Sequence, residues 1–580
     1  MAPSLSGSRL GVCHLLTLSV LGGALFCAPT GLVGQKAPPQ SVPAGAGEIG
    51  REQPKLRVTW QPANPENLDQ VIDRIISREH VVVTTLRRYS PLVETYIQNV
   101  RPESELGTVP ADDKYFLGRA ELANGVELRS LTEKSGITHK MFGGLKGFFS
   151  FAIRYLPGGF LQMIFIDTNG FDRQHYKFEY VRRVFLGEVR CLVFNVTPLP
   201  HAGTGRFLGR IWVEDQDYTI VRFNGAYSGN SKSSFYFHFD SWRVNAGPGS
   251  WLPAYVYSEE SNLRYALVKR LRFKAQTRLW GYKLSRVGQE QELSRVLVEA
   301  PTPVQDETEA AKDLSPVQVR REWDREAEDN VIERLEGIGL LAPSGEVNKV
   351  LETVVNNLEV TNNLDIQPEV RCRVLLTSTL ESFTVGNTIV LSRGLIDVLP
   401  DEATLATMLV HELGHIVLGH RIDPQYAFFD RLLFDDKDTF RHFIFSRPPG
   451  QEEAASRKAA ELLNNSPYKG KLGNAARFAQ ALNDRAKQIP NLISPHLGNR
   501  VPVDTAMQTA SVPPEVENAN QLVALPLGSR IKVDPWSGRI EMLKSKPVGS
   551  IAECEKMPFE VTPFLPYLTR QSASKTAATK

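Results

Sequence analysis

The chain has 580 residues, which is enough for two or three domains that each bury a core. Hydrophobic residues make up 42% of it and charged residues 23%, the composition of a soluble globular protein. The 67 Lys and Arg nearly balance the 65 Asp and Glu, so the formal net charge is only +2. A charge this small gives no electrostatic reason to expect nucleic acid or an anionic membrane as a partner.

The N-terminal residues 1–35 have the pattern of a signal peptide. Arg9 precedes an apolar run over residues 10–26, which is short for a membrane span and is followed by small residues. Cys27 invites comparison with lipoproteins, but Phe26 stands where lipoprotein processing prefers a small residue. We therefore expect an exported protein, periplasmic or secreted, with no lipid anchor and no transmembrane helix beyond the signal.

Three cysteines remain once such a signal is removed, namely Cys191, Cys372 and Cys554. An odd number of cysteines at wide spacing predicts neither a disulfide framework nor a cysteine zinc cluster. We therefore expect these thiols to be buried or incidental.

The next part of the chain predicts a leader followed by a β-rich domain. Residues 36–55 are rich in Pro, Gly, Ala and Gln, which predicts a flexible leader. Helical periodicity over residues 67–101, with a break near residue 90, opens a domain that we expect to span 56–296. From 115 to 284 the pattern changes to short runs rich in Phe, Tyr, Val and Ile between turns. Consecutive strands with no helices between them predict an antiparallel sheet.

Within this β-rich domain, residues 209–225 predict a hairpin that turns at 214–217. In pattern, although in no motif, the domain weakly resembles the curved sheet and helix of the periplasmic lipoprotein carriers LolA and LolB. A generic β scaffold is the alternative. The strand pattern is found in six segments: 160–170, 176–187, 189–199, 207–227, 233–244 and 252–260.

The second half of the chain predicts a different architecture. The acidic, proline-bearing residues 297–314 predict a linker, and residues 315–500 a mainly helical domain with a small sheet. The fold class that we expect is therefore α+β. Residues 501–580 predict a C-terminal extension with one hairpin and a disordered end. The expected elements are helices over 317–341 and 344–358, a strand pair over 370–376 and 388–391, and the C-terminal hairpin over 529–533 and 539–543.

One further helix carries the motif H-E-x-x-H, formed by His411, Glu412 and His415. Residues four apart lie on one face of a helix, so the two imidazoles converge on one point with Glu412 beside it. Asp401 is a suitable N-cap and Gly419 a suitable stop, which favours a helix rather than a loop. The motif predicts a site for one zinc ion per chain, with His411 and His415 as ligands.

A catalytic zinc takes a third protein ligand and keeps one position for water. One class of zinc peptidase uses a third histidine six residues after the motif, but Arg421 stands there in this chain. His420 would lie on the opposite side of the helix from His411, so we expect it to have a supporting or a surface role. The first glutamates downstream are Glu452 and Glu453.

Helical geometry favours Glu452 as the third ligand. Ala455, Ala459 and Leu463 lie within roughly 60° of it on a helix, whereas Glu453 lies on a more polar face. A carboxylate that points into a core needs a partner, and zinc is a good one. A surface glutamate is the alternative reading. In that case the third ligand would be one of five aspartates: Asp423, Asp430, Asp435, Asp436 or Asp438.

Residues 317–500 resemble the HtpX/BepA-like zinc metalloendopeptidases, gluzincins whose third ligand begins an E-x-x-A-D helix. The likeness includes residues 381–399, which are similar to the N-A-F strand and G-L-L turn of that family. It continues through the zinc helix to residues 452–463, where Glu452 aligns with the family glutamate. The resemblance implies a peptidase fold, a zinc cofactor and polypeptide substrates.

Two positions depart from the family pattern. Ser456 stands where the family has an aspartate that orients a zinc-binding imidazole. Ser494 replaces the histidine of H-P-x-x-x-x-R, where His496 could substitute and Arg500 could hold the oxyanion. A degenerate, poorly active peptidase is therefore the alternative to an active one.

The leading hypothesis is an exported zinc metalloendopeptidase with Glu412 as its catalytic base, acting by resemblance in envelope protein quality control. We expect the strand at 384–391 to hold an extended substrate by β-addition. The rival hypothesis is a lipid- or lipoprotein-binding module with an inactive peptidase domain. The sequence specifies neither the substrate nor the oligomeric state.

Overall fold

The computed structural model describes most of the chain from residue 68 to 500 and four short segments beyond it, all within one unit, Asn64–Lys580. The predicted signal peptide, leader and linker, together with Cys554, lie outside the described residues. The described ranges are 68–103, 107–123, 126–132, 157–228, 237–264, 270–284, 316–423, 426, 436–494, 496–500, 522–524, 530–533, 540–542 and 568–570.

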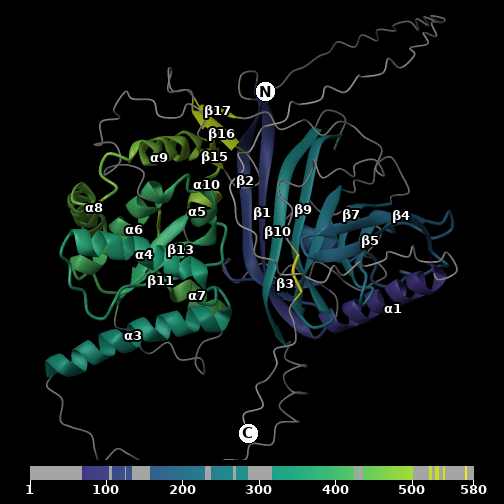
Figure 1. Ribbon diagram of the computed structural model, residues 1–580, viewed down its shortest axis with the longest axis horizontal. Coiled ribbons are helices and arrows are strands. Elements are labelled where there is room, and N and C mark those ends of the chain that lie inside the picture. Colours follow the sequence, from purple (N-terminus) through teal and green to yellow (C-terminus); the bar gives the residue numbers. More distant parts are fainter. Residues whose placement is uncertain are drawn as a thin grey trace, which may run out of the picture. The chain divides into compact units, whose positions relative to one another are not determined.

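A ten-stranded antiparallel sheet forms the first half of the described chain (Figure 1). Its strand order is β3-β2-β1-β10-β9-β8-β7-β6-β5-β4. The strands are β1 (Tyr89–Glu103), β2 (Gly107–Glu121), β3 (Glu127–Ser130), β4 (Tyr176–Leu186), β5 (Val189–Pro198), β6 (Phe207–Glu214), β7 (Ile220–Tyr227), β8 (Phe239–Gly247), β9 (Ser250–Arg264) and β10 (Arg270–Leu284). The predicted hairpin at 209–225 is confirmed, because β6 and β7 pair with Ile211 opposite Phe223.

Two predicted elements differ from the structure. The helix expected over 67–101 ends early, as α1 (Leu68–Leu86), and β1 follows it. Pro91 explains the change, because the residue before a proline is disfavoured in helical conformation. The strand expected over 160–170 is in fact a 3-10 helix, η3 (Pro157–Ile164). Periodicity cannot separate a short apolar run in a strand from one in a buried helical turn.

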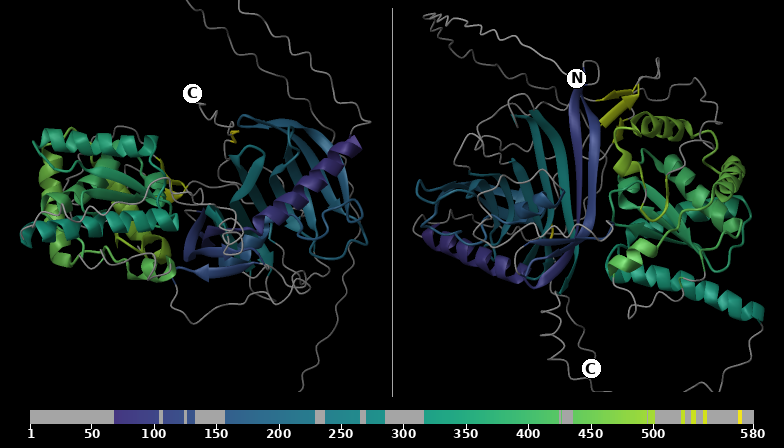
Figure 2. Two further views of the ribbon diagram at one scale, coloured as in Figure 1. Left: turned by 90° about the horizontal axis from the view of Figure 1, so that it is seen from below. Right: turned by 180° about the vertical axis from the view of Figure 1, so that it is seen from behind.

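Helix α1 runs across one face of the sheet (Figure 2), and η3 shares its hydrophobic cluster. A buried ion pair joins α1 to the sheet, because Arg243 donates to both carboxylate oxygens of Glu79 at 2.7 Å. A second buried pair lies within the sheet, where Arg222 bonds Asp240 through two 2.8 Å contacts.

The second half of the described chain combines helices with a four-stranded sheet of order β11-β13-β12-β14, which confirms the α+β fold class (Figure 1). The strands are β11 (Arg371–Leu375), β12 (Glu381–Val385), β13 (Thr388–Ser392) and β14 (Asn499–Arg500). The helices are α3 (Pro316–Ile338), α4 (Glu346–Thr361), α5 (Arg393–Val398), α6 (Glu402–Val417), α7 (Asp436–His442), α8 (Pro449–Asn464), α9 (Gly473–Arg485) and α10 (Pro490–Ile493).

The strand expected at 384–391 is two strands. Gly386, with φ of +56°, turns the chain between β12 and β13, and this left-handed conformation favours glycine. The inner strand β13 pairs with β11 on one side and β12 on the other. Of β12 and β13, only β12 therefore has a side that is covered neither by β11 nor by the other strand of the hairpin, and β14 pairs there with Glu381 and Ser382.

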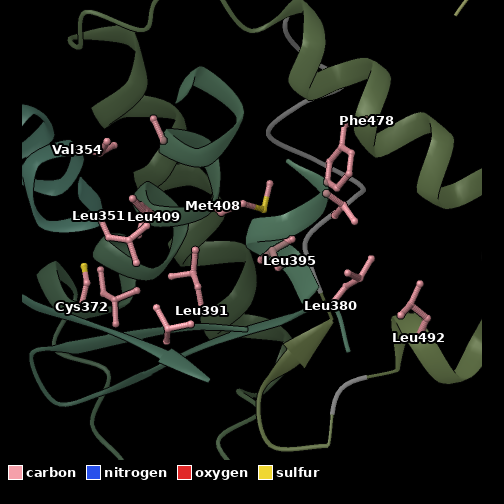
Figure 3. Close-up of a cluster of buried hydrophobic side chains, with 14 of the residues drawn as sticks. Leu351, Val354, Cys372, Leu380, Leu391, Leu395, Met408, Leu409, Phe478 and Leu492 are labelled. Atoms are coloured by element: carbon pink, nitrogen blue, oxygen red, sulfur yellow. The ribbon is translucent and has the colours of Figure 1, made fainter. Parts of the chain in front are cut away.

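Helix α6 packs on this small sheet through a shared core (Figure 3). Met408 and Leu409 on α6 belong to the same buried cluster as Leu391 on β13 and Leu351 on α4. All four side chains are at most 1% exposed. Burial of this kind contributes on the order of 1.5–3 kcal/mol per large aliphatic side chain, so the position of α6 is strongly determined.

Carboxylates of the large sheet accept hydrogen bonds from the second half of the chain. Glu94 accepts from the amide of Ser378 at 2.6 Å, and Asp113 accepts from the amides of Asn491 and Leu492 at 3.0 and 2.9 Å. These bonds tie the segments that precede β12 and β14 to the large sheet.

The C-terminal extension contributes a three-stranded sheet of β15 (Leu522–Ala524), β16 (Arg530–Val533) and β17 (Ile540–Met542). The predicted hairpin is confirmed as the antiparallel pair β16 and β17. Among the described helices, none combines the length and the apolar character needed to cross a membrane.

Candidate metal centre

Helix α6 carries the three side chains of the H-E-x-x-H motif. It begins where Asp401 accepts a hydrogen bond from the Thr404 amide at 2.8 Å, so the predicted N-cap is confirmed. His411, Glu412 and His415 are 3%, 1% and 1% exposed. Buried polar groups are costly without partners, and the partners of these three therefore decide what the site can do.

Helix α8 crosses α6 at Gly414, the residue before His415. A Cβ atom at this position would lie 2.9 Å from the carbonyl oxygen of Ala455, closer than real Cβ contacts come. Glycine thus allows a close approach of the two helices. Ala455 and Ala459 are 0% and 1% exposed, as expected for the face of α8 that carries Glu452.

Glu452 reaches both imidazoles. Its Oε2 lies 3.2 Å from Nε2 of His411, and its Oε1 lies 3.4 Å from Nε2 of His415. One ligand atom from each of the three residues lies within 4.8 Å of the other two, so this group of described residues could hold a metal ion. Glu453 lies instead at the surface, 3.8 Å from Arg457.

The donors of this group suit a metal ion. Burial alone would raise the pKa of Glu452, but hydrogen bonds and charge from His411 and His415 outweigh it and lower the pKa to about 2. The carboxylate is therefore ionised near neutral pH. Nε2 of His415 is buried and makes no hydrogen bond of normal geometry. Two imidazole nitrogens and one carboxylate that converge in this way fit the donor set of a catalytic zinc.

Strand β12 holds the carboxylate of Glu412. Ser382 Oγ donates to Oε1 at 2.6 Å and Thr384 Oγ1 donates to Oε2 at 2.5 Å. Residues two apart on a strand face the same way, which is why both hydroxyls reach one carboxylate. Bonds to an ionised acceptor are stronger than neutral ones and keep Glu412 in one orientation. In the sequence, this role is marked only by two hydroxyl residues spaced two apart. That spacing does not predict a contact with Glu412 unless the strand is already known to face α6.

Arg447 is a charged neighbour of the centre that the sequence did not single out. Its Nη2 donates to the carbonyl of Thr384 at 3.2 Å. Burial lowers the pKa of Arg447, and the negative charges of Glu412 and Glu452 counteract this lowering. No motif marks Arg447, so only the fold reveals that its charge acts on the centre.

The structure corrects the expected position of His420. Helix α6 ends at Val417, and the chain reverses at Gly419, whose φ is +69°. The His420 amide then donates to the carbonyl of His415 at 3.0 Å, and the two Nδ1 atoms lie 2.9 Å apart. The expectation that His420 lies on the far side of the helix was wrong because it assumed that the helix continued to this residue.

The described aspartates among those considered as third ligands do not join the metal-binding group. Asp436 has other partners, since it lies 3.3 Å from Arg119 and 3.7 Å from Lys283. The other described candidates are Asp423 and Asp438, and those outside the described residues are Asp430 and Asp435.

The residues at, or near, the positions where this chain departs from the family pattern have different surroundings in the structure. His496 stacks on Tyr115 of β2 with ring centroids 5.1 Å apart, and its amide donates to Glu381 at 3.1 Å. The backbone of Arg500 pairs with Glu381 in β14. Ser494 follows α10, and Ser456 is partly buried on α8.

Comparison with known proteins covers both halves of the chain. No curated protein matches the sequence. A LolA superfamily protein from Nitrosomonas europaea matches in structure at 10% identity and a TM-score of 0.23, over 37% of this chain and 93% of that one. A DUF1329 family protein from Desulfovibrio piger matches at 12% identity and a TM-score of 0.22, over 38% and 93%.

The family comparison concerns the metal centre itself. Residues 344–429 match the model of Peptidase family M48. The matched segment contains His411, Glu412 and His415 and ends before Glu452. The predicted resemblance to zinc metallopeptidases is therefore confirmed over this segment, which is similar to Peptidase family M48.

Proposed function

We propose that the chain is an exported zinc-dependent endopeptidase that hydrolyses peptide bonds of polypeptides in envelope protein quality control. The observation that carries the proposal is the convergence of His411, His415 and Glu452 on one point, with their ligand atoms within 4.8 Å. The match to Peptidase family M48 supports the reaction class. Export rests on the predicted signal peptide, and the role in quality control rests on the resemblance to HtpX/BepA-like enzymes.

In this proposal His411, His415 and Glu452 hold zinc, and Glu412 moves the proton. Bound zinc would polarise the substrate carbonyl and lower the pKa of its water to about 7. Glu412 takes the proton of the attacking water and delivers it to the leaving amine. The hydroxyls of Ser382 and Thr384 can follow this transfer, because a hydroxyl that donates to a carboxylate can also accept from a carboxylic acid.

The outer edge of β12 is the proposed place for an extended substrate. Within the described residues, Phe383–Val385 pair with β13 only, whereas β14 covers Glu381 and Ser382. A peptide that adds to this edge would gain main-chain hydrogen bonds and so bind with little dependence on side chains. Arg447 already donates to the Thr384 carbonyl there, so it would contact or yield to the incoming strand.

Zinc analysis and proteolysis of the purified chain test the proposal. We expect about one zinc per chain and cleavage of unfolded casein that a chelator abolishes and added zinc restores. Protein that purifies without zinc and does not bind it, or cleavage that survives the chelator, would contradict the proposal. Protein that holds zinc but leaves casein intact would favour the rival, a lipid- or lipoprotein-binding module with an inactive peptidase region.

A further inference from the structure

We propose that His420 is the positioning residue for His415, fixing the tautomer and the ring orientation in which His415 binds the metal. The inference rests on the proposed function and names a residue beside the same site that is not a member of the metal-binding group of the described residues. The Nδ1 atoms of the two rings lie 2.9 Å apart, and the ring centroids are 5.1 Å apart with the planes inclined at 60°.

The chain path makes this contact specific. After α6 ends, Gly419 adopts φ of +69°, and the amide of His420 returns to the carbonyl of His415 at 3.0 Å. A backbone bond and a side-chain bond thus join the same two residues. The ring of His420 is held by its own main chain beside His415 and does not depend on a distant element.

The direction of the side-chain bond follows from the metal. His415 belongs to the metal-binding group, and its Nε2 lies 3.4 Å from Oε1 of Glu452, another member of that group. In the proposal Nε2 is therefore the ligand atom and must offer a lone pair. The proton of the neutral His415 ring therefore sits on Nδ1, which donates. Nδ1 of His420 must then accept, and the proton of the His420 ring sits on Nε2. The opposite direction would place a proton on the metal-binding nitrogen of His415.

The burial of His415 makes its hydrogen bond to Nδ1 of His420 hard to replace. His415 is 1% exposed, so few waters can replace a lost partner of its Nδ1 hydrogen. A buried donor that is left without an acceptor is destabilising. A partner on the outer nitrogen of a metal-binding imidazole typically changes metal affinity by about 10 to 100-fold. In this chain Ser456 stands where the related enzymes have an aspartate that orients a zinc-binding imidazole. We infer that His420 supplies such an acceptor to His415.

Four substitutions of His420 in the full chain test whether an atom at the place of its Nδ1 must accept a hydrogen bond from His415. His420→Asn and His420→Asp place an acceptor oxygen where Nδ1 lies, because both atoms are bonded to Cγ. His420→Gln carries its polar atoms one bond further, and His420→Leu has none. Zinc affinity would be measured by competition with a chromogenic chelator, and thermal unfolding of the metal-free proteins would show that each variant folds.

We expect His420→Leu and His420→Gln to bind zinc about 10 to 100-fold more weakly than the unmodified chain. His420→Asn and His420→Asp should stay within about threefold of it or bind more tightly, because their oxygen accepts in the same place. Equal affinity in all five proteins would overturn the inference. So would equal losses in the Asn and Leu variants, provided that both fold.

The proposed function fails on a different result. An unmodified chain that binds no zinc in this titration would contradict the peptidase proposal itself. An unmodified chain that binds zinc and cleaves casein, with His420→Leu unchanged in affinity, would leave the peptidase proposal intact and remove only the role of His420.

Discussion

In the large sheet, Arg243 meets Glu79 through two 2.7 Å hydrogen bonds, with both side chains fully buried. In the metal centre, two buried imidazoles share the single carboxylate of Glu452, and Nε2 of His415 makes no hydrogen bond of normal geometry. Both regions hold a carboxylate among buried side chains, but in the large sheet it faces one guanidinium, whereas in the metal centre it lies between two imidazoles. A buried polar cluster thus indicates a functional site where several side chains converge on one common point instead of forming separate pairs.

The largest effect should come from breaking the matched pair. Arg243→Met keeps much of the volume but leaves Glu79 as an uncompensated buried charge, which should lower the free energy of unfolding by about 3–5 kcal/mol. Denaturant unfolding followed by fluorescence would measure it.

The exposed pair of Arg173 with Asp69 is the matched control. Its side chains are 41% and 82% exposed, and Arg173→Ala should cost less than about 1 kcal/mol. Similar losses from both substitutions would mean that burial does not distinguish the two ion pairs.

In the metal centre, Glu412→Gln should leave the fold and zinc content unchanged but lower kcat on casein by at least about a hundredfold, since it removes the proton acceptor. One of the two hydroxyls of Ser382 and Thr384 can still donate to the amide oxygen, and the other can accept from the amide nitrogen. Near-normal turnover with full zinc content would exclude Glu412 as the base.

Removing the shared carboxylate should act on the metal and not on the fold. Glu452→Gln replaces an ionised ligand by a weak neutral one, and zinc affinity should fall at least about tenfold, as losses of outer partners already cost that much. Glu453→Gln, at the next position on α8, is the control and should retain zinc because its carboxylate faces Arg457. Equal losses of zinc affinity in the two variants would mean that Glu452 is not the third ligand, and one of the alternative aspartates would then have to be considered.

The smallest effect should be found at the two described cysteines, Cys191 on β5 of the large sheet and Cys372 on β11 of the small sheet. Burial, followed by the charges of nearby carboxylates, raises the pKa of Cys191 and of Cys372 to about 12. A raised pKa keeps both thiols protonated at pH 8, and only the thiolate reacts with alkylating agents. Mass spectrometry after iodoacetamide treatment should therefore show both unmodified in the native protein and modified in urea. Rapid native modification of either residue would contradict its burial.

The parts of the site that could be predicted from sequence are those with local geometry. His411, Glu412 and His415 follow from the helical period, and the facing of Glu452 follows from Ala455 and Ala459 on the same helix. The signals span at most a few turns of one element. In the structure α6 and α8 pack together, and each helix presents the face that was predicted from its own sequence.

The parts that could not be predicted depend on chain reversals and on distant partners. His420 was misplaced because the reversal at Gly419 changes its direction. Thr384 and Arg447 contact each other across 63 residues of sequence, and no periodicity reports such a pairing. In the large sheet, β1 was read as helix because its apolar residues fit both periods over a short run.

Gly414 gives the metal centre a fragility that its donors alone would not suggest. It has no side chain and is not among the proposed ligands, yet a single added methyl group would press on the backbone of α8 at Ala455. Shortening Glu452 to an aspartate would displace one carboxylate, whereas enlarging Gly414 would displace the helix that carries it. If every position were substituted in turn, replacements of Gly414 should therefore reduce activity as strongly as replacements of the proposed ligands. The cause would be a steric clash between the two helices and not the loss of a metal-binding or catalytic group.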